Sequence, residues 1–166
     1  SANINPLGPP ENLRPVISRT LEEVVHYPDP QSIELAEAVG QAFGLDPDHV
    51  VLGNGSTELI FALPRALGMT RAVIPAPCYV DYSRAAELGG LEVEFFPMPE
   101  EQGFVLDCQA LQAQIRSKDL VIVGLPNNPT GMCPDLEALH ALAGNNPEAF
   151  FLLDEAFADF VPGLGT

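Results

Sequence analysis

Four short polar segments carry the side chains of this sequence that are best suited to binding and catalysis. Each segment directly follows a run of apolar residues, and the four are Gly53–Thr57, Pro77–Tyr79, Asn127–Gly131 and Asp154–Phe157. Where such runs are parallel strands, their carboxyl ends meet at one edge of a sheet, and open α/β sheets bind ligands at that edge. We therefore expect the four segments to contribute to one binding site.

The first segment, Gly53-Asn54-Gly55-Ser56-Thr57, is a turn between a predicted strand and a predicted helix. Unpaired backbone N–H groups and the positive end of the helix dipole make such a turn suitable for binding a phosphate. Gly55 allows the backbone to approach a ligand closely, and the hydroxyl groups of Ser56 and Thr57 add donors. A plain turn between a strand and a helix has a similar composition, so this segment alone leaves both interpretations open.

Asp154 ends the apolar run Phe150–Leu153. The same pattern is typical of the Walker B strand of nucleotide hydrolases, but those enzymes also need a glycine-rich loop with a lysine that reaches the phosphates. The only lysine of the sequence, Lys118, is not in such a loop, which excludes that class. Asp154 has a different use if the ligand is a pyridine, because a carboxylate beside the ring nitrogen keeps the ring protonated, and the protonated ring draws electrons from a substrate. Asp154 is therefore a candidate catalytic residue, with a helix cap or a surface turn as the alternative.

The most specific signal is Asn127-Asn128-Pro129-Thr130-Gly131, which follows the apolar run 120–125. The amide of an asparagine can donate to a phenolate oxygen, and an Asn-Pro bond can adopt the cis form that sets the direction of this side chain. A generic β-turn is the alternative for these residue types. Cys78, Cys108 and Cys133 have neither the spacing of zinc ligands nor that of a disulfide framework, so we predict no metal site.

Alternation of apolar strands and helical stretches predicts an α/β fold with a mostly parallel sheet. Residues 1–30 are rich in Pro, Gly and Asn and are expected to form an extended N-terminal arm, followed by one domain over residues 31–166. The predicted strands cover residues 50–52, 72–74, 91–96, 120–125 and 150–153, and the predicted helices cover 33–43, 56–68, 80–88, 106–115 and 136–143. The pattern stops at Thr166 without a helix to cover the last strand, so we expect the sequence to be part of a longer domain.

Composition restricts the class of protein further. The 166 residues include 46% hydrophobic and 18% charged residues, which is typical of a soluble globular domain. The net charge of −16 opposes binding to a nucleic-acid backbone. No apolar run approaches the roughly 20 residues that a membrane helix needs. The scattered cysteines and the absence of a recognisable signal peptide favour a reducing cytoplasm.

The order of the four segments resembles that of the class I/II aminotransferases, which depend on pyridoxal 5'-phosphate (PLP), and the resemblance covers nearly the whole chain. It implies a three-layer α/β/α large domain with the aspartate aminotransferase fold. By this resemblance, Gly55–Thr57 binds the cofactor phosphate, and Tyr79 stacks on the pyridine ring. Asn128 then bonds the phenolic oxygen, and Asp154 pairs with the pyridine nitrogen.

Two features are similar to particular branches of that family. Tyr27, in the segment 26–29, matches the histidinol-phosphate aminotransferases, in which this tyrosine reaches the cofactor phosphate of the partner subunit. The match implies a homodimer with shared active sites, whereas a structural arm with a buried tyrosine is the alternative. Residues 1–10 and 154–160 look more like the threonine-phosphate decarboxylases of cobalamin synthesis. Phe157 stands where the transaminases usually have a tyrosine that donates to the phenolic oxygen, and its lack of a hydroxyl is consistent with decarboxylation.

The family binds its cofactor through a Schiff-base lysine in a later Ser-x-x-Lys segment, and residues 1–166 contain no such segment. Lys118 precedes the strand 120–125, so we expect it at the opposite end of the sheet from the site. We therefore expect this chain to be inactive by itself and the whole enzyme to act on an amino acid that carries a phosphate. Decarboxylation of L-threonine-O-3-phosphate is the first hypothesis, and a histidinol-phosphate-type aminotransferase is the second. A non-catalytic module that binds PLP or a partner protein is the third.

Overall fold

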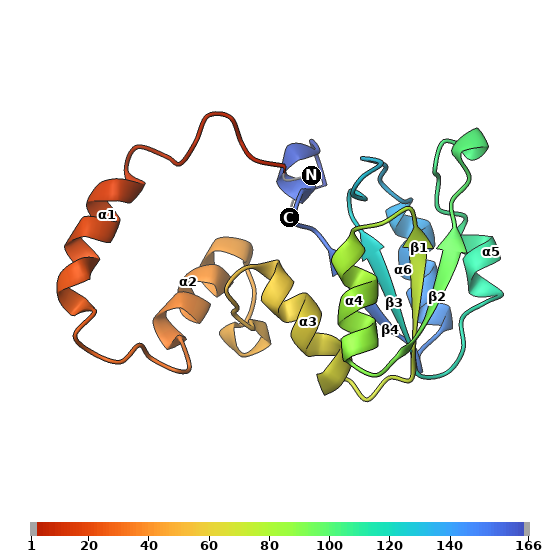
Figure 1. Cartoon of the computed structure of the whole chain (residues 1–166), viewed down its shortest axis with the longest axis horizontal. Helices are drawn as coiled ribbons and strands as arrows, with labels where there is room; N and C mark the ends of the chain where they lie inside the picture. The colour runs from red at the N-terminus through yellow and green to blue at the C-terminus, as the bar shows by residue number, and fades with distance from the viewer. Residues whose placement is uncertain (1–2, 165–166) are drawn as a thin grey trace. The chain divides into compact units, whose positions relative to one another are not determined.

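The computed structural model describes residues 3–164, which form two compact units that adjoin in the sequence between Val51 and Leu52 (Figure 1). The elements of the first unit are α1 (Leu13–Thr20), the 3-10 helix η1 (Leu21–Glu23), α2 (Ile33–Phe43) and the 3-10 helix η2 (Pro47–His49). The expectation of an arm that is extended throughout is therefore wrong, because α1 interrupts it. Leu13 and Ile17 have helical spacing, and Pro15 lies in the first turn, where its missing N–H removes no helical hydrogen bond.

The second unit is built on a sheet of four parallel strands in the order β2-β1-β3-β4. The strands are β1 (Arg71–Ala76), β2 (Glu92–Pro97), β3 (Asp119–Gly124) and β4 (Phe150–Asp154). The interior strand β3 is buried along its whole length, whereas β4, at the edge of the sheet, is mostly half-buried. The predicted strand at residues 50–52 does not form, because no neighbouring strand pairs with it and Val51 is 74% exposed.

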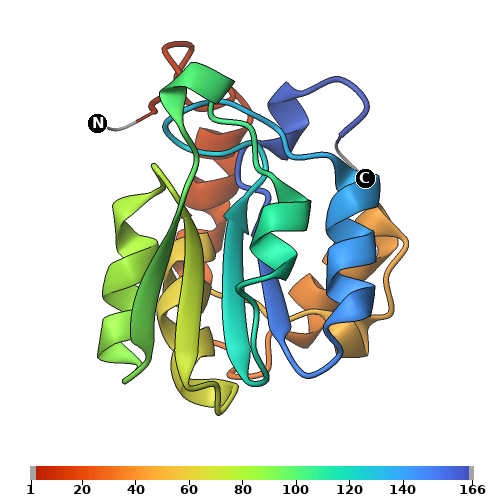
Figure 2. The same ribbon diagram turned by 90° about the vertical axis from the view of Figure 1, so that its right-hand side faces the viewer.

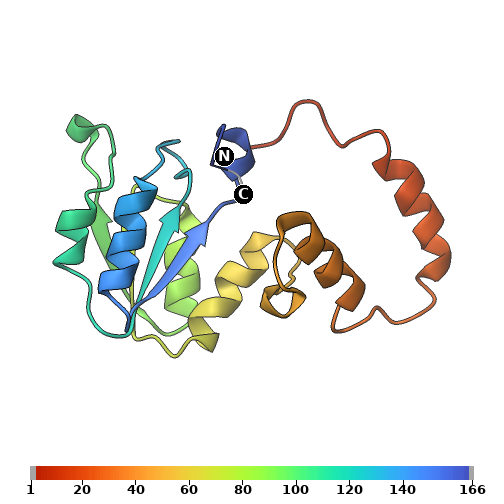
Figure 3. The ribbon, with the colours of Figure 1, turned by 180° about the vertical axis from the view of Figure 1, so that it is seen from behind.

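Helices cover both faces of this sheet and produce the expected three layers (Figures 2 and 3). They are α3 (Ser56–Ala66), α4 (Val80–Leu88), α5 (Cys108–Gln112) and α6 (Leu136–Asn145), with the short 3-10 helices η3 (Glu100–Gln102) and η4 (Ala158–Phe160). One core cluster joins α3 and α4 to the sheet, and a second joins α5 and α6 to it. Successive strand residues point to opposite faces, so Ile122 belongs to the first cluster and Val121 to the second.

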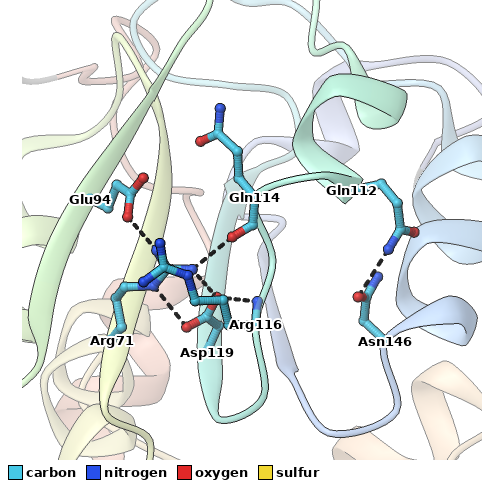
Figure 4. Close-up of polar contacts among 7 residues, drawn as sticks. All are labelled: Arg71, Glu94, Gln112, Gln114, Arg116, Asp119 and Asn146. Carbon is cyan, nitrogen blue, oxygen red and sulfur yellow. Dashed lines mark hydrogen bonds and ion pairs between the residues drawn. The ribbon is translucent and has the colours of Figure 1, made fainter.

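An ionic cluster joins three strands near their amino ends (Figure 4). Arg71 of β1 forms ion pairs with Asp119 of β3 and with Glu94 of β2, and its guanidinium also donates to the carbonyl oxygen of Gln114 at 2.7 Å. The Asp119 carboxylate also accepts from the backbone N–H of Arg116 at 2.7 Å. The buried guanidinium is thus fully paired, at the edge of the sheet opposite to the polar segments.

Candidate functional site

The strand order places a topological switch point between β1 and β3. From β1 the chain passes through α4 to β2, and from β2 it returns through α5 to β3 on the other side of β1. Because α4 and α5 cover opposite faces of the sheet, the loops that follow β1 and β3 diverge at their carboxyl ends, which is where open α/β sheets bind ligands. The segments 77–79, 127–131 and 154–157 follow β1, β3 and β4 and lie at this edge, as the sequence predicts.

Asp154 is the last residue of β4, and both of its carboxylate oxygens accept hydrogen bonds. Oδ2 accepts from the hydroxyl of Tyr82 at 2.6 Å, and Oδ1 accepts from the backbone N–H of Ala156 at 3.1 Å. The main chain is held as well, since the carbonyl oxygen of Asp154 accepts from the N–H of Leu125 at 2.8 Å. The half-buried carboxylate therefore has a defined direction at the edge of the sheet.

Tyr79 follows β1 and is half-buried at the same edge. Its ring meets the ring of Tyr82 edge to face, with the centroids 5.6 Å apart. Its hydroxyl donates to Oδ2 of Asp81 at 2.7 Å, and this bond, together with burial, raises the pKa of Tyr79. The nearby Thr57 hydroxyl opposes that increase in the pKa of Tyr79, which places Thr57 beside the phenol. Two of the predicted site residues, Tyr79 and Thr57, are thus brought together.

The amino end of α3 reaches this edge because the helix runs back toward the start of β1 and carries Thr57 in its first turn. Gly55 has φ +79° and ψ 165°, a conformation that glycine adopts and other residues avoid. Because the N-cap residue is Gly55, no side chain at that position caps the helix, and the Glu58 carboxylate accepts from the N–H of Asn54 at 2.5 Å. The N–H groups of the first turn, which begins at Ser56, suit a phosphate.

The two asparagines of the segment 127–131 have different surroundings. Asn127 is 8% exposed, and its Nδ2 donates to the carbonyl oxygen of Pro77 and to the hydroxyl of Thr130, at 2.9 Å in each case. It thereby joins the loop after β3 to the loop after β1. Asn128 is half-buried and precedes a cis peptide bond, and none of the side-chain hydrogen bonds among residues 3–164 involves its amide. Asn128 thus has a free amide at this edge, whereas Asn127 holds the loop.

Two residues of this edge, Tyr82 and Gly124, were not identified from the sequence, and Asn127 was part of a predicted segment but was given no role of its own. Tyr82 is 1% exposed, and a Cβ atom at Gly124 would lie 3.2 Å from its hydroxyl oxygen. One signal could have identified Tyr82, because it follows Tyr79 by one helical turn and a buried tyrosine needs a partner for its hydroxyl. The sequence offers no signal that separates Asn127 from Asn128.

Three other residues that stand out in the sequence have different surroundings. Tyr27 belongs to the first unit, where its side chain is fully exposed, and its contact with a partner subunit stays a prediction. Lys118 directly precedes β3, at the opposite end of the strands from Asp154, as predicted. Cys78 is half-buried next to Tyr79, and burial raises the pKa of its thiol. Among residues 3–164, no group of His, Cys, Asp and Glu is arranged to hold a metal ion, and no helix has the length and apolar character to cross a membrane.

These groups suit a planar heteroaromatic phosphate with a basic ring nitrogen. The uncapped end of α3 suits the phosphate, the Tyr79 ring offers an aromatic face, the Asn128 amide can donate to an oxygen substituent, and the Asp154 carboxylate can pair with a protonated nitrogen. PLP has each of these parts, so the donor set of this edge fits PLP.

Comparison with known proteins agrees with that fit. The family model of the class I and II aminotransferases matches residues 1–165. The chain is 37% identical to the adenosylcobalamin biosynthesis bifunctional protein CobDQ of Leptospira interrogans, over 96% of this chain and 19% of that protein. It is 34% identical to the threonine-phosphate decarboxylase of Salmonella typhimurium, over 98% of this chain and 45% of that protein. It is 36% identical to the histidinol-phosphate aminotransferase of Thermococcus gammatolerans, over 96% of this chain and 46% of that protein.

A solved structure supports the same fold. A mutant aspartate aminotransferase of Thermus thermophilus matches with a TM-score of 0.82 and 26% identity, over 92% of this chain and 44% of that chain. The chain therefore spans less than half of the length of the relatives that it matches.

Proposed function

Since the chain belongs to the class I and II aminotransferase family, we propose that it is the cofactor-binding part of a PLP-dependent enzyme that acts on a phosphorylated amino acid. The observation that carries the proposal is the convergence of the end of α3, Tyr79, Asn128 and Asp154 at one edge of the sheet. The threonine-phosphate and histidinol-phosphate enzymes among its relatives support the class of substrate.

Each part of the cofactor has a candidate partner in this chain. The backbone and hydroxyl groups of Gly55–Thr57 would hold the phosphate, the ring of Tyr79 would stack on the pyridine, and the Asn128 amide would donate to the phenolic oxygen. When bound, PLP supplies an electron sink for bond cleavage at the substrate Cα. The Asp154 carboxylate would hold a proton on the ring nitrogen, which keeps that electron sink effective.

The first candidate reaction is the decarboxylation of L-threonine-O-3-phosphate in cobalamin biosynthesis. This reaction breaks the bond between Cα and the carboxyl carbon, releases carbon dioxide and leaves a proton on Cα. Two observations support it: the relatives from cobalamin and threonine-phosphate chemistry, and Phe157, which has no hydroxyl to donate to the phenolic oxygen. Phe157 is half-buried just before η4, and its ring centroid lies 6.4 Å from that of Phe160.

The second candidate is a histidinol-phosphate-type transamination, which a relative at 36% identity and the position of Tyr27 support. In that case Tyr27 would contact the cofactor phosphate of the partner subunit, in a homodimer with shared active sites. We place either enzyme in the cytoplasm, without a membrane or nucleic-acid partner. A non-catalytic module that binds PLP is the alternative of another class, because Lys118, the only lysine, lies at the far end of β3.

A titration of this chain with PLP, followed by absorbance, tests the proposal. We expect saturable binding that Asp154→Ala weakens about tenfold, which corresponds to the loss of one charge-assisted contact. Asp159→Ala is the matched control, because Asp159 is an exposed acid in η4 five residues further along the chain. Borohydride reduction and intact mass should show no specific covalent adduct. If the unmodified chain does not bind PLP, the proposed cofactor site of this chain is wrong.

The reaction is decided by product analysis of the full-length enzyme supplied with L-threonine-O-3-phosphate. Release of carbon dioxide without an oxo product supports decarboxylation. Formation of an oxo product from histidinol phosphate together with an amino-group acceptor identifies the aminotransferase instead.

A further inference from the structure

We propose that Tyr82 is a positioning residue that holds the Asp154 carboxylate in place for the cofactor ring nitrogen, an inference that rests on the proposed function. Tyr82 lies in α4, whereas Asp154 is the last residue of β4, and the Tyr82 hydroxyl oxygen is 2.6 Å from Oδ2 of Asp154. It is the only side chain of the described residues that hydrogen-bonds to this carboxylate. The other carboxylate bond, to the N–H of Ala156, comes from the chain immediately after Asp154.

Tyr82 is rigidly placed by its surroundings. Its side chain is 1% exposed, belongs to the core cluster of α3, α4 and the sheet, and meets the ring of Tyr79 edge to face. A buried aromatic side chain of this kind has few alternative rotamers, because the interior around it is densely packed. The direction of its hydroxyl is therefore set by the core, and the core in turn sets the direction of the carboxylate.

Gly124 makes this contact possible. It is the last residue of β3 and the register partner of Asp154 in β4, so it lies beside Asp154 in the sheet. A Cβ atom at this position would lie 3.2 Å from the Tyr82 hydroxyl oxygen and 3.1 Å from Cα of Asn127. Such distances are tighter than ordinary van der Waals contacts, so a larger residue would displace the hydroxyl or the loop. The absence of a side chain at Gly124 leaves room for the bond.

The direction of the hydrogen bond follows from the charges. Burial and the negative charge of Asp154 both raise the pKa of Tyr82, so at neutral pH the phenol keeps its proton and acts as the donor. A neutral donor stabilises the ionised carboxylate without neutralising it, because the proton stays on the phenol. The second oxygen of Asp154 has only a backbone partner, so the carboxylate can still pair with a protonated ring nitrogen.

A purely structural tyrosine, whose hydroxyl merely has a partner in the core, predicts a different result. In that case the loss of the hydroxyl changes stability but leaves the protonation of the bound cofactor unchanged. The ring nitrogen of bound PLP separates the two cases, since its ¹⁵N chemical shift differs between the protonated and the neutral pyridine.

The experiment uses the 166-residue chain with PLP labelled with ¹⁵N at the ring nitrogen. We expect the protonated-pyridine resonance in the unmodified chain and in the control Ser83→Ala, which removes a hydroxyl of α4 that donates to the Val80 carbonyl oxygen. Tyr82→Phe should keep the fold but move the resonance toward the neutral position and weaken PLP binding about tenfold. A resonance and an affinity unchanged by Tyr82→Phe would reduce Tyr82 to a structural role and overturn the proposal.

A measurement without cofactor separates this inference from the proposed function. Urea unfolding should be measured for the Tyr82→Phe, Asp154→Ala and doubly substituted chains. We expect non-additive changes in the free energy of unfolding, which would show that the two side chains are coupled. Coupling without PLP binding by the unmodified chain would overturn both the proposed function and the positioning role, but would leave the hydrogen bond established. Additive effects, with PLP bound, would overturn the positioning role alone.

Discussion

Arg71 and Asp119 form a two-point ion pair at the amino ends of β1 and β3, where their side chains are 5% and 2% exposed. Nε donates to Oδ1 at 2.9 Å, and Nη2 donates to Oδ2 at 2.5 Å. The hydrogen bond to Asp119 is the largest cause of the raised pKa of Arg71. Because this pair lies at the opposite end of the strands from Asp154, we infer that it stabilises the sheet and takes no part in the site.

Breaking the pair should therefore lower stability strongly. Arg71→Met should decrease the free energy of unfolding by about 3–5 kcal/mol, because it leaves the Asp119 carboxylate buried without its partner. Urea unfolding followed by circular dichroism measures the change. The matched control is Arg84→Met, because the Arg84 side chain is 64% exposed and pairs with Asp81 near the surface. An exposed pair of this kind contributes at most about 1 kcal/mol, so equal losses in both variants would contradict the prediction.

The two neighbouring asparagines should respond differently to substitution. Asn127→Ala should lower the free energy of unfolding by about 1–3 kcal/mol, because it leaves the Pro77 carbonyl oxygen without its buried donor. Asn128→Ala should change that free energy by less than about 0.5 kcal/mol and should weaken PLP binding instead. Unfolding curves and PLP titrations of both variants show which asparagine stabilises the fold and which one binds PLP. A larger loss of stability for Asn128→Ala would show that the two roles are exchanged.

Alkaline pH should destabilise the folded chain partly through Tyr82. Burial and the hydrogen bond to Asp154 raise the pKa of Tyr82 above its ordinary value, so the folded state keeps a proton that the unfolded state loses above about pH 10. The corresponding contribution to the free energy of unfolding is complete below that pH and falls by up to about 1.4 kcal/mol per pH unit above it. Unfolding of the unmodified chain and of Tyr82→Phe should be compared from pH 8 to pH 11, where all other titrating groups are common to both. An advantage of the unmodified chain that stays constant with pH would refute this assignment.

The turn before α3 should require glycine at position 55. Gly55→Ala should lower the free energy of unfolding by about 1–3 kcal/mol, because its φ of +79° with ψ of 165° is a conformation that a Cβ atom disfavours. No heavy atom lies within 4 Å of the added Cβ, so the cost comes from the backbone alone. Gly144→Ala in α6 is the control of opposite sign, because there alanine favours the helix by about 1 kcal/mol. Thermal unfolding of both variants tests whether the two substitutions change the free energy of unfolding in opposite directions.

Most of the fold could be predicted from the sequence because its signals are local. The alternation of apolar runs predicted β1 to β4, and helical spacing with a glycine stop predicted α2, which ends at Phe43 before Gly44. The predictions that failed concern segments whose local pattern is compatible with more than one structure. The apolar run 50–52 resembles a strand, but no other strand pairs with it. The proline-rich arm was expected to be extended, but its Leu13 and Ile17 have helical spacing and lie in α1.

The sequence by itself determined which residue types follow each strand, and through the resemblance it indicated PLP, Asp154 and Asn128. Only the tertiary structure decided how these residues are supported, because the supporting contacts join positions that are far apart in the chain. Tyr82 and Asp154 are separated by 72 positions, and their contact depends on the packing of α4 against β1 and β2 and on the missing side chain of Gly124. Asn127 and Asn128 are the same residue type in adjacent positions, and only the fold directs one amide to Pro77 and leaves the other free. Local sequence specifies elements and turns, whereas the direction of a functional side chain is set by the core on which it packs.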